Sequence, residues 1–368
     1  MTNPYSVGQL LETYEIDLDW IVGAVQERSP ELVGLQLPDG LRDYGPALAD
    51  WLADAAGVEA VISGDPSFGA CDLALDMTRI GVDLLVHFGH SPMPSVGPIE
   101  VFDILYVPAY SKAPIADVVR EAGRQLQGKR VGLLTTAQHA TRMNEAVELL
   151  REAGCEPHIG FGDDRVLNPG QLLGCNFTAA RTVAAEVDVF LYIGSGDFHP
   201  IAAAWGLETP VWVADPLTGE VKQVDDRVEA LMRQRHAAIA RAQQADTFGI
   251  LVATRVGQER MKLARGLAKL CRRHGKKAYI ISLDLFTPDA LASFRNLGAW
   301  VNTGCPRITT DDFARYPVPM LTPPELEIVL GQRSWDDYLF DEFKGRRPAP
   351  HQHADAVLVT TTGADPQP

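Results

Sequence analysis

The sequence contains no run of about 18 or more apolar residues, the length that a helix needs to span a membrane. It also lacks a secretory signal at its start, because MTNPYSVGQLLETYEIDLDW alternates apolar with acidic positions instead of placing an apolar run after basic residues. We therefore expect a protein that neither crosses a membrane nor is secreted, and that works in the cytoplasm.

Positive charge is scarce. The chain has 33 lysines and arginines, only 8 of them lysine, against 48 acidic residues, so its net charge is -15. This balance argues against a groove for nucleic acid, which needs clustered positive charge. With 46% hydrophobic residues over 368 positions, the chain can still pack the cores of two or three ordinary domains.

Cysteine is also sparse, and its spacing excludes the common local motifs. The closest two of the five cysteines are Cys155 and Cys175, so the chain has no CxxC redox pair, no zinc knuckle and no CxxxCxxC motif. Scattered cysteines in a reducing compartment are usually small buried hydrophobes rather than ligands or disulfides. That explanation suits Cys155, between a helix and a strand, and Cys271, within an expected helix.

Three cysteines have a different local context. Cys71 lies in GDPSFGACD, Cys175 in GQLLGCN and Cys305 in NTGCPRI, each after a short apolar run and among glycines. A tight turn or a helix N-terminus at such a place can hold a thiolate near unpaired backbone N–H groups. Because 104 and 130 residues separate the three, only the fold can assemble them into one site.

Short apolar runs recur in a pattern that repeats about every 100 to 120 residues. Runs that do not alternate with polar residues, separated by helical stretches, are typical of parallel sheets covered on both faces. They predict strands in three groups of four, at 32–37, 60–62, 83–88 and 104–107, then 131–135, 158–161, 188–193 and 210–213, then 248–252, 278–281, 299–302 and 317–321.

We therefore expect an α/β protein of three similar small domains, each a parallel sheet flanked by helices. The boundaries would be 1–110 with Cys71, 111–220 with Cys175 and 221–345 with Cys305. The remainder, 346–368, is rich in Pro, Ala and Thr without helical periodicity, and we expect it to be disordered.

Ligands of parallel sheets bind outside the carboxyl ends of the strands. Cys71 and Cys175 follow the second expected strands of their units, and Cys305 follows the third strand of its own. All three would emerge on the ligand side, so domains facing a common axis could bring them together. At this level a shared metal site and separate packing roles both remain open.

Several stretches, in order and at their spacing, carry a resemblance to a known family. Over nearly its whole length the chain resembles archaeal diphthamide synthase, the 2-(3-amino-3-carboxypropyl)histidine synthase family. The stretches are GDPSFGACDLA (64–74), HFGHS (87–91), GLLTTAQH (132–139), LLGCN (172–176), YIGSGDFHP (192–200), VGQER (256–260), CPRIT (305–309) and LTPPEL (321–326).

The resemblance implies a 4Fe-4S cluster held by Cys71, Cys175 and Cys305 and arranged centrally among the domains. Three thiolates leave one iron open for the methionine part of S-adenosylmethionine, the cosubstrate. An electron would then cleave the bond between sulfur and the γ-carbon, releasing methylthioadenosine and a 3-amino-3-carboxypropyl radical. The absence of CxxxCxxC agrees with this cleavage, which differs from that of ordinary radical S-adenosylmethionine enzymes.

The resemblance also implies the acceptor and the partners. The fragment would add to C2 of a histidine imidazole in translation elongation factor 2, the first step of diphthamide biosynthesis, in a homodimeric transferase. An electron donor is required, and the sequence does not identify it. No catalytic residue beyond the cluster is implied.

Four further residues are candidates for binding substrate. Asp197 and His199 follow Gly194 and Gly196, where the backbone can approach a ligand closely, although a structural role explains them equally well. Gln258 and Arg260 could hold the carboxylate of S-adenosylmethionine, because a guanidinium matches a carboxylate, but the start of a surface helix is the alternative.

His87 and His90 at a strand end are better explained as structural histidines.

Two rival functions remain at this stage. Quinolinate synthase is also a three-domain α/β enzyme with one cluster cysteine in each domain, although the contexts GDPSFGACD and CPRIT favour diphthamide synthase. The chain could instead be a non-catalytic partner in a diphthamide complex, but the presence of all three cysteines argues against that.

Overall fold

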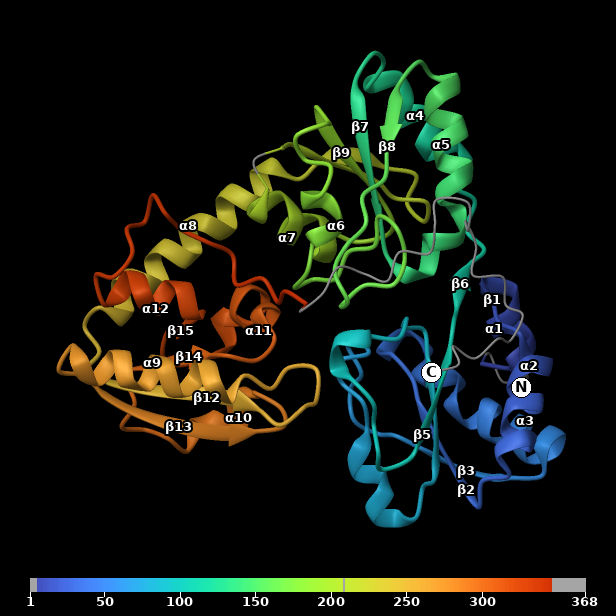
Figure 1. Cartoon of the computed structure of the whole chain (residues 1–368), viewed down its shortest axis with the longest axis horizontal. Helices are drawn as coiled ribbons and strands as arrows, with labels where there is room; N and C mark the ends of the chain where they lie inside the picture. Colours follow the sequence, from blue (N-terminus) through green and yellow to red (C-terminus); the bar gives the residue numbers. More distant parts are fainter. Residues whose placement is uncertain (1–4, 208, 346–368) are drawn as a thin grey trace.

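The computed structural model describes residues 5–207 and 209–345. The chain has an α/β fold in which parallel sheets are flanked by helices, and Figure 1 shows three such sheets in three lobes that follow one another along the sequence. Among the described residues, no helix is both long and apolar enough to cross a membrane. The expected disorder of 346–368 concerns residues outside the described part of the chain.

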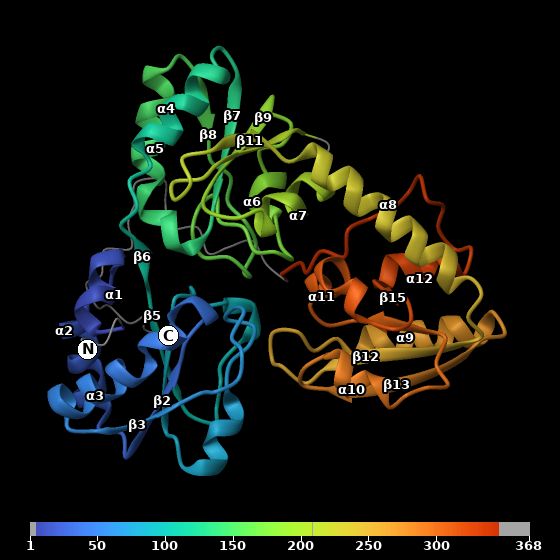
Figure 2. The same ribbon diagram turned by 180° about the vertical axis from the view of Figure 1, so that it is seen from behind.

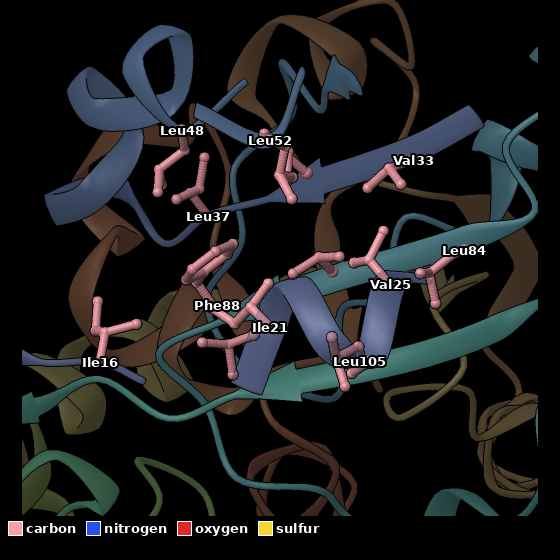
Figure 3. Close-up of a cluster of buried hydrophobic side chains, with 14 of the residues drawn as sticks. Ile16, Ile21, Val25, Val33, Leu37, Leu48, Leu52, Leu84, Phe88 and Leu105 are labelled. Atoms are coloured by element: carbon pink, nitrogen blue, oxygen red, sulfur yellow. The ribbon is translucent and has the colours of Figure 1, made fainter. Parts of the chain in front are cut away.

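The first sheet has the strand order β3-β2-β4-β5, with all neighbours parallel. One face packs on two helices, as Figure 3 shows, and the other face packs on a 3-10 helix. The strands are β2 (Leu32–Gln36), β3 (Glu59–Ile62), β4 (Leu84–Phe88) and β5 (Asp103–Val107), the helices are α2 (Leu18–Arg28) and α3 (Gly45–Ala56), and the 3-10 helix is η2 (Leu75–Ile80).

A short antiparallel ribbon, absent from the sequence prediction, joins the start of the chain to the connection between the first two sheets. In it β1 (Tyr14–Glu15) pairs with β6 (Tyr110–Ser111). Helix α1 (Val7–Thr13) precedes the ribbon and begins at a capping box formed by Ser6 and Gln9.

The second sheet has the strand order β11-β10-β9-β7-β8. Helices α4 (Ala116–Gln125) and α5 (Met143–Glu152) cover one face, and α6 (Thr178–Arg181) and α7 (Phe198–Gly206) lie on the other. The strands are β7 (Arg130–Thr135), β8 (Glu156–His158), β9 (Val189–Ile193), β10 (Val211–Ala214) and β11 (Val221–Gln223).

The long helix α8 (Asp225–Ala242) leads from the second sheet to the third, as Figure 2 shows from behind. It contacts α7, which lies on the second sheet, and α12 (Pro323–Val329), which lies on the third. Arg235 of α8 and Glu325 of α12 form a fully buried ion pair at 2.7 Å, and the Arg235 guanidinium also donates to the carbonyl oxygens of Thr309 and Met320. These bonds satisfy the buried charges and fix α8 against the third sheet.

The third sheet has the strand order β13-β12-β14-β15, all parallel. Helix α9 (Met261–Arg273) covers one face together with α12, and α10 (Pro288–Ala292) lies on the other. The strands are β12 (Thr247–Ala253), β13 (Lys277–Leu283), β14 (Ala299–Asn302) and β15 (Met320–Leu321). Along α9 the buried residues recur at helical spacing and include Cys271, in agreement with its predicted packing role.

Four 3-10 helices and one short helix complete the connections. They are η1 (Asp39–Tyr44), η3 (Pro94–Val96), η4 (Ala137–Arg142), η5 (Phe313–Arg315) and α11 (Pro306–Asp311).

Besides the missed ribbon of β1 and β6, the strand prediction was wrong in three places. The strand expected at 158–161 forms earlier in the chain, as Glu156–His158, and Gly160 beyond it packs against α6, where an added Cβ would lie 1.9 Å from the Ala179 carbonyl oxygen. Of the strand expected at 317–321 only β15 forms, after two prolines that lack the N–H a ladder requires. Finally, β11 was missed, and it runs antiparallel to β10, so the second sheet is mixed rather than purely parallel.

Candidate active site

Three cysteines lie in loops beyond the carboxyl ends of strands in three different sheets. Cys71 lies between β3 and η2 in a turn closed by the Asp72 N–H and the Gly69 carbonyl at 3.1 Å. Cys175 lies between β8 and α6 in an equally tight turn, and Cys305 is the N-cap residue of α11, directly after β14. The predicted combination of turns and a helix start is therefore present.

The electrostatics show that these three thiols are neighbours. Burial raises the pKa of Cys71, and the nearby Cys175 raises it further. Burial likewise raises the pKa of the Cys305 thiol, and the like charges of the Cys175 and Cys71 thiolates raise it further. Burial therefore raises the pKa of these thiols more than neighbouring N–H groups lower it, and the free thiols stay protonated. A metal that binds their thiolates must displace these protons.

The other two cysteines lie elsewhere. Cys155 packs in the core of the second sheet, where its Sγ donates to the Leu126 carbonyl oxygen at 3.3 Å. Cys271 is fully buried in the core of the third sheet, and burial raises its pKa to about 11. Both are structural residues, as the sequence indicated.

No group of three or more His, Cys, Asp or Glu side chains in residues 5–207 and 209–345 is arranged to hold a single metal ion. The ligands of an iron-sulfur cluster bind different iron atoms, so they stand farther apart than the ligands of one ion.

The Cys71 loop is held by the loop that follows β12. The Gly257 N–H donates to the Cys71 carbonyl oxygen at 3.1 Å, and Gln258 Nε2 donates to the Cys71 Sγ at 3.5 Å. A Cβ on Gly257 would lie 2.4 Å from the Cys71 Cα, so only glycine permits this approach. Arg255 pairs with Asp72 and, at 3.2 Å, with Asp284. These contacts join the first sheet to the third at the site.

Cys175 and Cys305 are held through their backbone carbonyl oxygens. The Cys175 oxygen accepts from the Phe343 N–H at 2.7 Å. The Cys305 oxygen accepts from Asn302 Nδ2, also at 2.7 Å. The backbone of each of these half-buried cysteines is therefore held in place.

Two buried arginines beside the thiols have N–H groups without a partner. Arg165, of which 8% is exposed, donates through Nη2 to the Gly257 carbonyl at 3.3 Å, but its Nε is unsatisfied. Arg307, of which 6% is exposed, pairs through Nη2 with Asp311 at 2.8 Å, while its Nε and Nη1 are unsatisfied. Buried guanidinium groups in this condition suit an anionic ligand. Sequence reasoning missed both, although Arg307 follows Cys305 by only two positions.

Comparison with known proteins decides the family. Residues 37–339 match the family model described as "Putative diphthamide synthesis protein". The chain belongs to this diphthamide synthesis family.

Relatives and a solved structure agree with this membership. The 2-(3-amino-3-carboxypropyl)histidine synthase of Pyrococcus horikoshii is 35% identical over 90% of this chain and 94% of its own length. Subunit 1 of the Caenorhabditis elegans enzyme is 28% identical, over 87% and 81%. The crystal structure of Dph2 from P. horikoshii with a 4Fe-4S cluster has a TM-score of 0.83 and 34% identity, covering 93% of this chain and 96% of that one. Membership favours the diphthamide alternative over quinolinate synthase.

The first pair of predicted substrate residues in this family member lies at the start of α7. Asp197 is ion-paired with Arg227 and, at 3.6 Å, with Lys222, so its charge is used within the protein. His199 lies near Arg307 and His90: burial, with smaller contributions from these two side chains, lowers its pKa to about 3.

The second pair follows β12. Gln258 contacts the sulfur of Cys71. Arg260 forms an ion pair with Asp341 at 2.6 Å and donates to the Thr303 carbonyl at 2.6 Å, so its guanidinium is already engaged. Of the four predicted residues, Gln258 contacts a thiol and His199 lies near Arg307, whereas Arg260 lies near Cys175 but, like Asp197, is paired within the protein.

A chain of hydrogen bonds behind Cys71 includes both histidines of the HFGH stretch. Gln36 donates to the Asp72 carbonyl at 2.6 Å and contacts His87 Nδ1 at 2.8 Å, and His87 Nε2 lies 3.0 Å from His90 Nδ1. Burial lowers the pKa of His90 to about 4, and burial and His90 lower the pKa of His87 well below its usual range.

These histidines predict a loss of stability in mild acid. The unfolded chain binds protons at histidine near pH 6.5 while folded His90 stays neutral down to about pH 4, so stability falls as pH drops through that window. From pH 7 to pH 5 His90 alone should cost on the order of 2 kcal/mol. Urea unfolding of the cluster-free protein would measure this, and His90→Gln should flatten the dependence. Equal slopes in both proteins would contradict the expectation.

Proposed function

We propose that this chain is a 2-(3-amino-3-carboxypropyl)histidine synthase. It transfers the 3-amino-3-carboxypropyl group of S-adenosylmethionine to C2 of a histidine in translation elongation factor 2, the first step of diphthamide biosynthesis. The observation that carries this proposal is the gathering of Cys71, Cys175 and Cys305, one from each sheet, in a chain of this family. The P. horikoshii synthase, similar over almost its full length, supports it.

The ligands of the proposed 4Fe-4S cluster are Cys71, Cys175 and Cys305. The unsatisfied buried N–H groups of Arg165 and Arg307 support this assignment, because they offer positive charge to the anionic group that three thiolates would make. When bound, such a cluster supplies an open iron for S-adenosylmethionine and the electron for radical cleavage of its bond between sulfur and the γ-carbon.

The protein residues bind and orient the substrate. Arg307 has unpaired N–H groups at Nε and Nη1, either of which can donate to the substrate carboxylate, while Asp311 and the Phe198 ring, whose centroid lies 3.9 Å from the guanidinium carbon, hold it in place. Gln258 keeps the Cys71 sulfur in position, and His199 lines the pocket as a neutral imidazole. This replaces Arg260 by Arg307 as the proposed carboxylate ligand.

Each sheet with its helices forms one of three small, similar domains around the cluster site. The proposed boundaries remain 1–110, 111–220 and 221–345, and the separate buried cores of the three sheets support them. In this arrangement the active site lies where three domains meet, the usual location of ligand sites in multidomain proteins.

The protein substrate and the electron donor follow from the proposed reaction, and the homodimer from the family resemblance. Elongation factor 2 is the protein substrate in the cytoplasm, an electron donor supplies the cluster, and the enzyme is a homodimer. Nucleic acid is not a partner, which the net charge of -15 supports.

The experiment that tests the function uses the anaerobically reconstituted protein with dithionite, S-adenosylmethionine and elongation factor 2 from a compatible host. Methylthioadenosine should form, and one histidine of the factor should gain a 3-amino-3-carboxypropyl group detected by mass spectrometry. A factor in which that histidine is Ala should gain nothing. Formation of 5′-deoxyadenosine without added mass would contradict the mechanism, and a cluster-free, inactive chain would favour the non-catalytic partner.

A further inference from the structure

The segment Asp341–Gly345, here called the 341–345 segment, returns from the third sheet to the cysteine site. In Figure 1 it belongs to the red end of the described chain, which runs from α12 back toward the loops near α6 and α11. It lies beyond residue 339, where the match to the family model ends. Its contacts therefore need an explanation of their own.

On one side the segment binds the Cys175 loop through its backbone. The Phe343 N–H donates to the Cys175 carbonyl oxygen at 2.7 Å, and the Phe343 carbonyl oxygen accepts from Asn176 Nδ2 at 2.7 Å. The Gly345 N–H donates to Asp163 Oδ2 at 2.5 Å, and the same carboxylate accepts from Asn176 Nδ2 at 3.0 Å. Phe343 and Gly345 thus hold the Cys175 loop, both directly and through Asp163, which they share with Asn176.

Glu342 adds contacts at the start of α6. Its carboxylate accepts from the Phe177 N–H at 3.2 Å and pairs with Arg181 at 2.9 Å. The loop that carries Cys175 is therefore fixed on both sides of Asn176.

On the other side the segment binds the support of Cys305. Asp341 forms a bidentate ion pair with Arg260 at 2.8 and 2.6 Å, and Arg260 in turn donates to the Thr303 carbonyl oxygen. Two guanidinium groups lie over the Phe343 ring, with the Arg260 carbon 3.9 Å and the Arg165 carbon 4.9 Å from its centroid. Only 8% of Asp341 and 7% of Phe343 is exposed, so these contacts are shielded from water.

We propose that the 341–345 segment is a positioning element that fixes the Cys175 loop relative to the Cys305 loop, and that Asp341 and Phe343 are its positioning residues. This rests on the proposed function, since the two cysteines must face one cluster. Five consecutive residues connect loops from two sheets that have no short connection along the chain. Without them, the Cys175 sulfur would move independently of the Cys305 sulfur.

The segment offers matched variants. Phe343→Ala removes both contacts with guanidinium groups. Gly345→Ala places a Cβ 1.9 Å from Asp164 Oδ1 and 2.8 Å from Asp163 Cγ, which displaces the end of the segment. Between them lies Lys344, whose side chain is 65% exposed and whose carboxylate contact is loose at 3.9 Å, so Lys344→Ala is the control.

The first measurement uses hydrogen–deuterium exchange of the full-length, cluster-free protein. In Phe343→Ala and in Gly345→Ala, the amides of 172–177 and 341–345 should exchange at least tenfold faster than in the wild type, and Lys344→Ala should match the wild type. Exchange in the cores of the three sheets should not change. Unchanged exchange at 172–177 in both variants, or an equal rise in Lys344→Ala, would overturn the proposal. If Phe343→Ala does not fold, the exchange rates of 172–177 in Gly345→Ala alone decide whether the proposal holds.

The second measurement separates positioning from a merely structural role. After anaerobic reconstitution, the two variants should lose iron to a chelator several times faster than the wild type, and the EPR spectrum of the reduced cluster should change in shape. Faster exchange with unaltered iron loss and an unaltered spectrum would overturn the positioning role. If the wild type itself binds no cluster, the proposed function fails, and the exchange result alone then decides whether the segment fixes the loop.

Discussion

Cys71→Ala, Cys175→Ala and Cys305→Ala should each abolish a stable 4Fe-4S cluster. Each change removes one of three thiolates supplied by three different loops, and no other cysteine lies at the site to replace it, since Cys155 and Cys271 are buried in the second and third cores. Anaerobic reconstitution followed by an iron and sulfide count, with an EPR spectrum of the reduced protein, measures the loss.

The controls are the two cysteines that lie in cores. Cys155→Ala and Cys271→Ala should keep the full iron content, because their sulfurs pack among apolar side chains. Each should cost on the order of 1 kcal/mol in unfolding free energy, the scale of a small cavity. A complete cluster in Cys305→Ala would refute the assignment, whereas iron loss in Cys271→Ala would indicate that unfolding rather than ligation is being measured.

Much of the fold was predictable because buried parallel strands leave a strong local signal. Runs such as 84–88 and 189–193 are apolar at every position or nearly so, and both form strands buried along their whole length. The strand β11 gave no such signal, since Val221–Gln223 is short and polar and is recruited by pairing with β10. Tertiary contacts, not local propensity, create that edge.

The site was predictable only where its residues carried their own context. Cys71, Cys175 and Cys305 stood out as candidates because each sits among glycines after a strand, but this context left a packing role open, and only the family resemblance named the three as ligands. Arg260 looked free to bind a carboxylate, but its partner Asp341 lies 81 positions away, and no sequence pattern links the two. The burial of Arg165 and Arg307 likewise depends on the meeting of loops from different sheets. Pairings of this kind follow from the assembled fold alone.

Arg307→Gln should raise the KM for S-adenosylmethionine about 10- to 100-fold, the factor that losing a charge-assisted hydrogen bond of about 1.5–3 kcal/mol produces. Burial lowers the pKa of Arg307, and Asp311 only partly compensates, so the cation remains in need of an anionic partner. A substrate carboxylate that accepts from one of the unpaired N–H groups of Arg307 would supply it. Initial rates of methylthioadenosine formation at varied substrate concentration measure the effect.

Two further variants separate binding from ligation. Arg307→Lys keeps the charge but loses the planar fork, so its KM should fall between those of the wild type and Arg307→Gln. Arg260→Gln should behave differently, because it breaks the ion pair with Asp341 and the bond to the Thr303 carbonyl: cluster retention should fall while the KM of the protein that still holds a cluster changes little. A large KM rise in Arg260→Gln with none in Arg307→Gln would reverse the assignment. Arg260, in the loop after β12, would then be the ligand of the substrate carboxylate.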